Sequence, residues 1–204
     1  MPQPLPSKAL STTLAPLTTA PPAAAGPFGL AHLDVQAFAL AQAALSGTEA
    51  LGQFPRLAAE CRPGAAPASA VEIFWQARGE QRSGNDGVPQ TWLVLQAQAQ
   101  VALTCQRCLE PVDTALQVDQ AYRFVAGTAE AEAQDDVCEE DVLALATDLD
   151  GLALLEDELL MALPLSPRHE ACPQQLPHAA AHAGAQLPEK AHPFAALQVL
   201  KDRL

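Results

Sequence analysis

The sequence predicts an α+β fold in which an antiparallel β-sheet, a meander, is packed by a few helices. Two observations lead to this prediction. Residues 71–78, 90–104 and 110–125 alternate apolar and polar side chains with the period of two that marks half-buried strands. Residues 150–162 instead place leucines at the spacing of an amphipathic helix. A sheet with one buried face that is covered by helices accounts for both patterns.

The three strands are expected to be neighbours because the segments between them are short and favour turns. Residues 83–87 read Ser-Gly-Asn-Asp-Gly, so the second strand folds back on the first. Residues 105–108, Cys-Gln-Arg-Cys, form the second connection. The predicted apolar face comprises Val71, Ile73, Trp75, Ala77, Leu93, Leu95, Ala97, Ala99, Val101, Leu103, Leu116, Val118, Tyr122 and Phe124.

The N-terminal part of the chain adds a leader and one helix to this prediction. Residues 1–27 are rich in Pro, Ala, Ser and Thr, which is typical of a flexible leader. Asp34 can cap a helix over 35–45 that Ser46 and Gly47 would end. Residues 51–57 are expected to form a short apolar turn or strand. A single domain is therefore expected over 28–172.

The C-terminal part, 173–204, is expected to be a linker followed by a short helix. Pro193 suits the first position of that helix. Phe194, Leu197 and Leu200 then lie on one side of it. A short isolated helix is marginal by itself, so we expect it to dock on the domain or to bind in a groove of a partner.

The chain is acidic, with a formal net charge of −13 at pH 7. Such a chain does not bind nucleic acid through bulk electrostatics, because phosphate binding draws on clustered lysine and arginine. The acidity fits either solubility or a basic protein partner. Residues 124–167 contain no lysine or arginine and carry half of the 24 acidic residues: Glu130, Glu132, Asp135, Asp136, Glu139, Glu140, Asp141, Asp148, Asp150, Glu156, Asp157 and Glu158.

The acidic stretch is expected to change character along its length. Its first part resembles a loop, and residues 142–146 are expected to be a short strand or the start of a helix. Asp148 or Asp150 can cap a helix that runs to about Ala162. Pro164 and Pro167 end that helix. Its apolar stripe is Leu152, Leu155, Leu159 and Leu163.

Several classes of protein are excluded by what the sequence lacks. It has no apolar run long enough to span a membrane and no segment that reads as a signal peptide. No nucleophile elbow, phosphate-binding loop or metalloprotease helix is present. The carboxylates are not paired in an apolar setting that would suit acid–base catalysis. We therefore expect a protein that is not an enzyme, with neither a membrane partner nor a small-molecule substrate.

Two pairs of residues have the spacing of metal ligands. Cys105 and Cys108 form a C-x-x-C at the predicted turn, and His169 and Cys172 form an H-x-x-C beyond the acidic helix. Three thiolates and one imidazole are a normal ligand set for tetrahedral zinc. The set would close a structural zinc site with no open position, because the protein supplies all four ligands. The alternative is a pair of half-buried cysteines and an ordinary surface histidine.

Other uses of the same residues remain open. A redox-active C-x-x-C normally stands at the start of a helix, and Pro111 fits badly into such a helix. Cys61 and Cys138 have no matching partners and are read as isolated thiols. Arg107 and Arg168 adjoin the proposed ligands. They are expected either to touch phosphates or to pair with neighbouring carboxylates.

Three stretches carry a resemblance to a known family. They are V-A-L-T-C-Q-R-C-L-E-P at 101–111, E-D-E-L-L-M-A-L-P-L-S-P-R-H at 156–169 and P-F-A-A-L-Q-V-L-K at 193–201. In this order they resemble the YceD family, the large ribosomal RNA subunit accumulation proteins of bacteria. The resemblance covers roughly 28–204. One difference from a typical metal knuckle is Leu109, which stands where glycine often follows the second cysteine.

The resemblance implies a cytoplasmic protein without known catalytic activity that serves the synthesis, processing or stability of 23S ribosomal RNA. The expected partner is an assembly intermediate of the large subunit or a basic ribosomal protein. It would be contacted through the acidic residues 130–158 and through the last helix, with Phe194 and Leu197. The alternatives are direct binding of 23S RNA by a zinc knuckle, through Arg107 and Arg168, and thiol oxidoreductase activity at the C-x-x-C.

Overall fold

The computed structural model describes residues 27–63, 67–84 and 87–172. It divides the chain into two units, 1–168 and 169–204, and the fold below belongs to the first. The elements run α1 (Val35–Leu40), β1 (Ala44–Ala50), the 3-10 turn η1 (Leu51–Gln53), α2 (Pro55–Glu60), β2 (Glu72–Ser83), β3 (Pro89–Thr104), β4 (Pro111–Val125), α3 (Thr128–Asp135), β5 (Asp141–Ala144) and α4 (Gly151–Met161).

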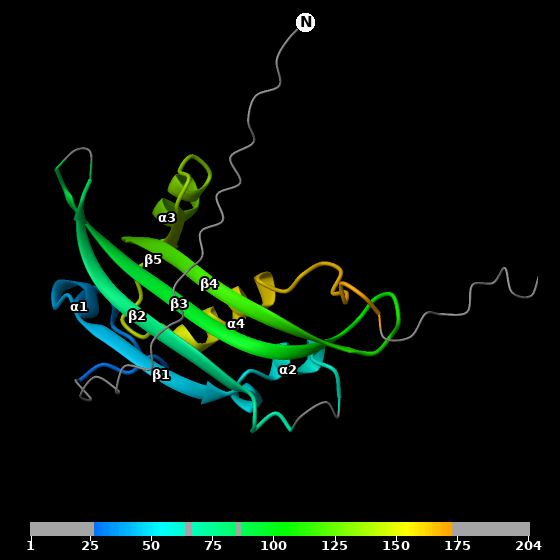
Figure 1. Ribbon diagram of the computed structural model, residues 1–204. Helices are drawn as coiled ribbons and strands as arrows, with labels where there is room; N and C mark the ends of the chain where they lie inside the picture. Colours follow the sequence, from blue (N-terminus) through cyan, green and yellow to red (C-terminus); the bar gives the residue numbers. More distant parts are fainter. Residues whose placement is uncertain (1–26, 64–66, 85–86, 173–204) are drawn as a thin grey trace, which may run out of the picture. The chain divides into compact units, whose positions relative to one another are not determined.

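The five strands form one sheet in the order β1-β2-β3-β4-β5, and the predicted α+β class is confirmed (Figure 1). The first four strands pair antiparallel with their neighbours, as the meander prediction requires. The fifth strand, β5, joins the edge of β4 in the parallel direction. A parallel neighbour needs a crossover connection rather than a tight turn, and the segment that contains α3 provides it.

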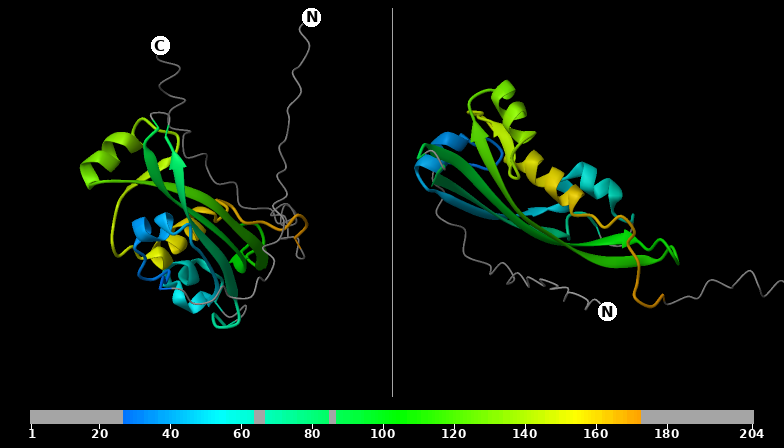
Figure 2. Two further views of the ribbon diagram at one scale, coloured as in Figure 1. Left: turned by 90° about the vertical axis from the view of Figure 1, so that its left-hand side faces the viewer. Right: turned by 90° about the horizontal axis from the view of Figure 1, so that it is seen from above.

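One face of the sheet carries the core. Ile73, Ala99 and Leu116 are register partners on β2, β3 and β4, and all three are buried. Leu155 and Leu159 of α4 are also fully buried. Figure 2 shows the helices on one side of the sheet. No helix of the described residues covers the other face, and none of the described helices is long and apolar enough to cross a bilayer.

The first helix is shorter than predicted, and the strand that follows it was missed. Asp34 caps α1 as expected, because its carboxylate accepts a hydrogen bond of 2.9 Å from the backbone N–H of Ala37. The chain then turns through Gln42, which has φ +47°, and enters β1. Gly47 therefore ends no helix. It pairs with Trp75, and a Cβ atom there would lie 2.6 Å from the indole ring.

Two further segments are helical where the sequence predicted a turn, a strand or a loop. Residues 51–60 form η1 and α2, with Pro55 at the first position of α2. This arrangement buries Leu51, Phe54 and Leu57. The first part of the acidic stretch contains α3, which packs against β5. Each missed helix has eight residues or fewer, too few to show a clear helical period.

A buried carboxylate joins α4 to α2. Asp150 caps α4 as predicted, accepting a 2.9 Å hydrogen bond from the backbone N–H of Ala153. Further along the same helix, Glu156 is only 6% exposed. Its Oε1 accepts hydrogen bonds from the backbone N–H groups of Arg56 (2.7 Å) and Leu57 (3.2 Å), while Oε2 accepts from Arg56 Nε at 2.9 Å. Glu156 thus satisfies N–H groups at the start of α2 that would otherwise lack partners.

The two acids after Glu156 also have partners within the fold. Asp157 accepts a hydrogen bond of 2.5 Å from the Arg56 guanidinium at the surface. Glu158 accepts one from the hydroxyl of Tyr122 on β4. The E-D-E run therefore ties α4 to α2 and to the sheet. Within the predicted contact surface 130–158, Glu156 is buried and cannot meet a partner, whereas Asp157 is exposed.

We predict that Glu156→Ala destabilises the protein far more than Asp157→Ala. The first change leaves buried N–H groups of α2 without an acceptor and is expected to lower the free energy of unfolding by about 2–4 kcal/mol. The second breaks an exposed ion pair and is expected to cost less than about 1 kcal/mol. Denaturant unfolding of both variants checks this, and equal losses would contradict the role given to Glu156.

We predict that Tyr122, the only tyrosine of the chain, stays protonated well above pH 10. Burial is the main reason that its pKa is raised above the ordinary value of about 10, and the hydrogen bond to the Glu158 carboxylate adds to it. The unfolded chain loses this proton first, so stability should fall as pH rises above about 10.

Absorbance of the tyrosinate ion in an alkaline titration measures this pKa directly. The native protein should show no tyrosinate at a pH where the protein in denaturant is titrated. Glu158→Gln should move the native transition part of the way back, because burial remains after the carboxylate charge is removed. A native transition near pH 10 would show that Tyr122 is not held in this way.

Candidate metal centre

The turn between β3 and β4 presents both thiols of the C-x-x-C. It is closed by two backbone hydrogen bonds of 2.9 Å, from Cys105 N–H to Glu110 O and from Leu109 N–H to Cys105 O. Thr104 and Pro111 are the last register partners before it. Cys105 and Cys108 are buried. The two long strands therefore fix the place of the turn, and the turn fixes both cysteines.

Leu109 adopts the backbone conformation that glycine usually supplies after the second cysteine of a metal knuckle. Its φ is +62°, in the left-handed region, where a side chain costs roughly 1–2 kcal/mol. The Arg62 guanidinium donates a hydrogen bond to the carbonyl of Leu109, and the Arg62 N–H donates one of 2.8 Å to Ala102 O. The departure from glycine therefore does not prevent the turn from taking the shape of a knuckle.

The segment after α4 also reaches this turn. Helix α4 ends at Met161, and prolines at 164 and 167 prevent its continuation. The backbone N–H of Gln106 donates a hydrogen bond of 2.9 Å to the carbonyl of Pro167. Arg107 and Arg168, each one residue further along, are both exposed. Three of the described arginines, Arg62, Arg107 and Arg168, thus adjoin the C-x-x-C turn.

The four predicted metal ligands form a cluster. The Sγ atoms of Cys105, Cys108 and Cys172 and a ring nitrogen of His169 all lie within 4.8 Å of one another. His169 and Cys172 are half-buried. Ligand atoms around one tetrahedral zinc ion lie about 3.5 Å apart, so a modest contraction would bring this set to bonding distance. Among the described residues it is the one group of at least three such side chains that can hold a metal ion.

The chemistry of this donor set suits a structural metal. Thiolate and imidazole are the ligands that zinc prefers, and four protein ligands leave no open position for a reacting water. Metal binding requires deprotonated thiols, and several thiolates held together out of water need a cation to balance them. The cluster can therefore hold an ion that pins the β3–β4 turn, and it has no place for a substrate.

The redox alternative does not fit the geometry. A helix N-terminus that would favour a reactive thiolate is absent after Cys108, because the described chain continues directly into strand β4. Of the cysteines outside the cluster, Cys61 is half-buried, and burial raises the pKa of its thiol, with a smaller contribution from Glu60. Cys138 is not isolated, since the Arg123 guanidinium contacts its sulfur at 3.1 Å.

The buried Arg123 is the main polar feature that sequence reasoning missed. Besides Cys138, its side chain contacts Gln134 at 2.6 Å and Glu140 at 3.1 Å. It therefore joins β4 to α3 and to the chain that follows α3. An arginine inside an alternating strand was the available signal. Of the residues predicted to bind a partner, Phe194 and Leu197 lie outside the described residues.

The chain belongs to the YceD family of large ribosomal RNA subunit accumulation proteins. Residues 93–201 match the family model "Large ribosomal RNA subunit accumulation protein YceD". A relative of the same name from Haemophilus influenzae is 34% identical over 125 residues, which cover 56% of this chain and 69% of the relative. No solved structure matches the chain significantly. The matched range, 93–201, spans the positions of both cysteines of the turn, the E-D-E run and the H-x-x-C pair.

We predict that the purified protein carries about one metal ion per chain and that Cys105→Ser removes most of it. Metal analysis of both proteins checks this. Cys61→Ser is the matched control, because Cys61 lies outside the cluster, and it should retain the metal. Chelation should lower the melting temperature of the wild type and of Cys61→Ser, with little further effect on Cys105→Ser. Equal metal content in the two variants would contradict the assignment.

Proposed function

We propose that this protein is a non-enzymatic factor for the synthesis, processing or stability of 23S ribosomal RNA. It acts in the cytoplasm on assembly intermediates of the large ribosomal subunit, through a basic ribosomal protein of these particles. Membership of a family named for large ribosomal RNA subunit accumulation supports a role in providing this RNA. The observation that carries the proposed mode of action is the acidic surface around α3.

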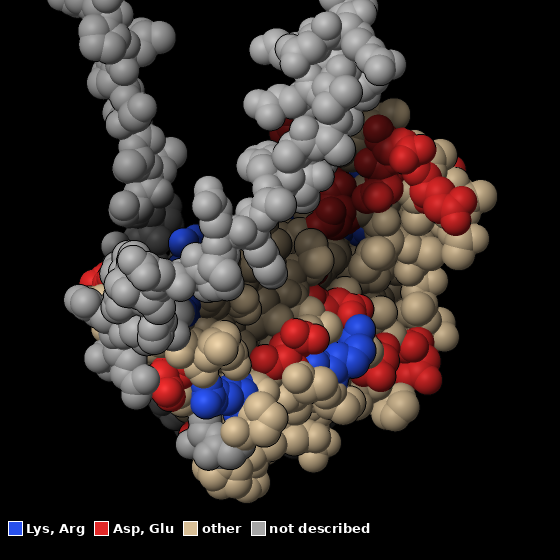
Figure 3. All heavy atoms as spheres, turned by 90° about the vertical axis from the view of Figure 1, so that its right-hand side faces the viewer, with Lys and Arg blue, Asp and Glu red and all other residues tan. Residues whose placement is uncertain are grey.

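The acidic surface is exposed and largely unneutralised. Figure 3 shows acidic side chains gathered at the upper right, where α3 lies, with few basic ones among them. Within the described part of the chain, the exposed side chains of Glu132, Asp136 and Glu139 make no hydrogen bond or ion pair. Arginine and lysine of a basic protein would find partners there without breaking contacts within the fold.

The metal that we propose for the Cys105, Cys108, His169 and Cys172 cluster is zinc, in a structural role. Thiolate-rich tetrahedral sets favour zinc over harder cations such as magnesium or calcium. The ion would tie residues near the end of the described chain to the β3–β4 turn. Its part in the function is to hold that turn and the arginines beside it in place.

A second function, direct binding of RNA at the turn, is supported by one observation. The hydrogen bond from Gln106 to Pro167 brings together the stretches that carry Arg107 and Arg168, and Arg62 contacts the same turn. These side chains form a local positive spot on an acidic protein. Such binding should weaken steeply with salt and on Arg107→Ala. Salt-insensitive binding would exclude it.

We predict that the protein co-sediments with precursor particles of the large subunit at low salt. The charge-reversal variant Glu132→Lys/Asp136→Lys should lose most of this association, because it replaces attraction by repulsion at the proposed contact. Sedimentation of lysate followed by immunodetection checks it. A matched control is Glu60→Lys/Asp113→Lys, which changes the net charge equally at exposed residues away from α3.

The control separates a local contact from an effect of net charge. Equal loss in both variants would assign the association to overall charge and contradict the α3 surface. Wild-type protein that remains wholly outside the particle fractions at low salt would argue against the proposed function itself.

A further inference from the structure

The uncovered face of the sheet is rich in carboxamides near its centre, with one carboxylate, that of Glu72, beside them. The strand register places Phe74 of β2, Gln98 of β3 and Gln117 of β4 side by side in one row across three strands. Nearer the C-x-x-C turn, Glu72 of β2 lies two residues from Phe74, and Gln100 of β3 lies two residues from Gln98. These side chains alternate with the core residues, so they stand on the face opposite the helices.

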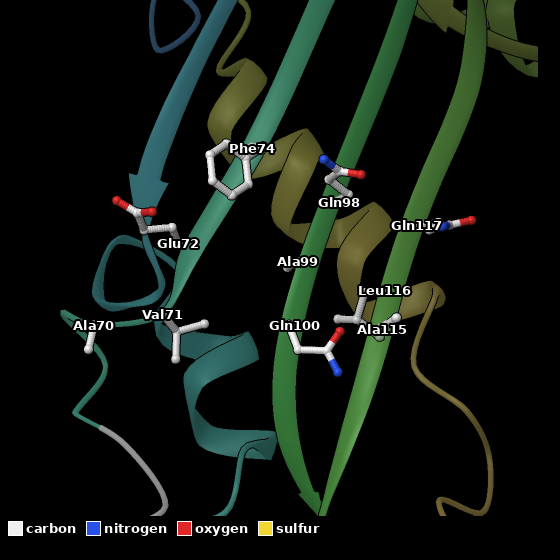
Figure 4. A pocket seen from close by; sticks show the side chains of 10 residues that line it. All are labelled: Ala70, Val71, Glu72, Phe74, Gln98, Ala99, Gln100, Ala115, Leu116 and Gln117. Atoms are coloured by element: carbon white, nitrogen blue, oxygen red, sulfur yellow. The ribbon is translucent and has the colours of Figure 1, made fainter. Parts of the chain in front are cut away.

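These side chains surround a hollow with a volume of about 420 Å³. Figure 4 shows it from the uncovered side, with α4 behind the strands, and presents the Phe74 ring face-on beside the side chain of Gln98. Half-buried Phe74 is thus a flat apolar surface with hydrogen-bonding groups beside it. A hollow of this size suits a group as large as a nucleoside.

We infer that this hollow binds an unpaired base of single-stranded RNA, stacked on Phe74 and hydrogen-bonded by the carboxamides of Gln98 and Gln117. A base is flat and uncharged, with donors and acceptors along its edge. A carboxamide offers one of each and can pair with a base edge in bidentate fashion. Proteins that recognise unpaired RNA bases commonly stack them on aromatic side chains of an open sheet.

The charges around the hollow fit a nucleotide and give it a direction. Arg78 stands on the same face four residues from Phe74, about 13 Å along β2, and is exposed. It makes no ion pair within the described residues. Glu72 lies on the opposite side of Phe74, and Asp119 of β4 carries a second negative charge on the same face. A phosphate attached to the stacked base is therefore attracted toward Arg78 and repelled from both carboxylates.

A protein segment is the less favoured occupant. An extended peptide gains its affinity from main-chain hydrogen bonds at the edge of a sheet, and the hollow lies on β2, β3 and β4, which are not edge strands. A helix would need a continuous apolar groove, whereas this hollow mixes Phe74 and small aliphatic side chains with three carboxamides and one carboxylate. The inference deepens the proposed function and rests on it for the identity of the RNA.

The test compares two substitutions of one residue. Fluorescence anisotropy with short labelled homo-oligonucleotides of A, C and U measures the affinity of the full-length protein. Phe74→Leu keeps an apolar side chain but removes the ring, and it should weaken binding by about 5- to 100-fold. Phe74→Trp should bind at least as well as the wild type. Thr48→Ala, the row neighbour of Phe74 on β1, is the control and should bind normally.

The outcomes separate this site from the proposed function. If Phe74→Leu and the wild type bind RNA equally and melt at similar temperatures, the RNA site is overturned. The proposed function is still supported in that case if the wild-type protein co-sediments with the precursor particles. Wild-type protein that binds no single strand also overturns the RNA site. If Phe74→Leu then lost particle association, the hollow would belong to a protein segment and the RNA assignment would be wrong. Preference for duplex over single strand would likewise refute it.

Discussion

The buried carboxylate of Glu156 is the contact on which the arrangement of the helices depends. It accepts hydrogen bonds from two backbone N–H groups and one guanidinium N–H of α2, so neither helix can shift without leaving a buried polar group unpaired. Because α4 is held here and by Tyr122 of β4, its last turn has a defined place. The chain beyond it reaches the β3–β4 turn at Pro167. An ion pair inside the fold thus decides where the residues beyond α4 arrive.

Sequence periodicity located the long elements because these repeat one pattern many times. Strands β2, β3 and β4 and helix α4 lie close to where the alternation and the leucine stripe predicted them. Strand β1 and helices α2 and α3 were missed, since each has eight residues or fewer and owes its form to tertiary contacts. Gly47, for example, looks like a helix terminator in the sequence, but it lies in a strand. Glycine is needed there because the Trp75 ring occupies the space that a side chain would take.

The candidate metal ligands could be found from the sequence because metal chemistry restricts residue type and spacing more tightly than packing does. The same reasoning could not separate acids that face solvent from acids used inside the fold. Glu156 and Glu132 look equivalent in the sequence, yet one caps a helix and the other is exposed. Only the partner tells them apart, and that partner is a hundred residues away for Glu156. Resemblance to a family drew attention to the E-D-E run, but it did not reveal that these acids form hydrogen bonds with α2 and β4 of the same chain.

The parallel pairing of β5 has a consequence for the α3 surface. A helix that bridges two hydrogen-bonded parallel strands is anchored at both ends, and Arg123 holds it further by contacting Gln134 on the helix and Glu140 in the chain after it. The acidic side chains of α3 therefore project from a fixed helix and not from an unstructured segment. A binding partner would not have to order this backbone on arrival, so less of the interaction energy would be spent on lost conformational freedom. Charges held in a fixed pattern can also discriminate between basic partners by shape, which an unstructured acidic segment does poorly.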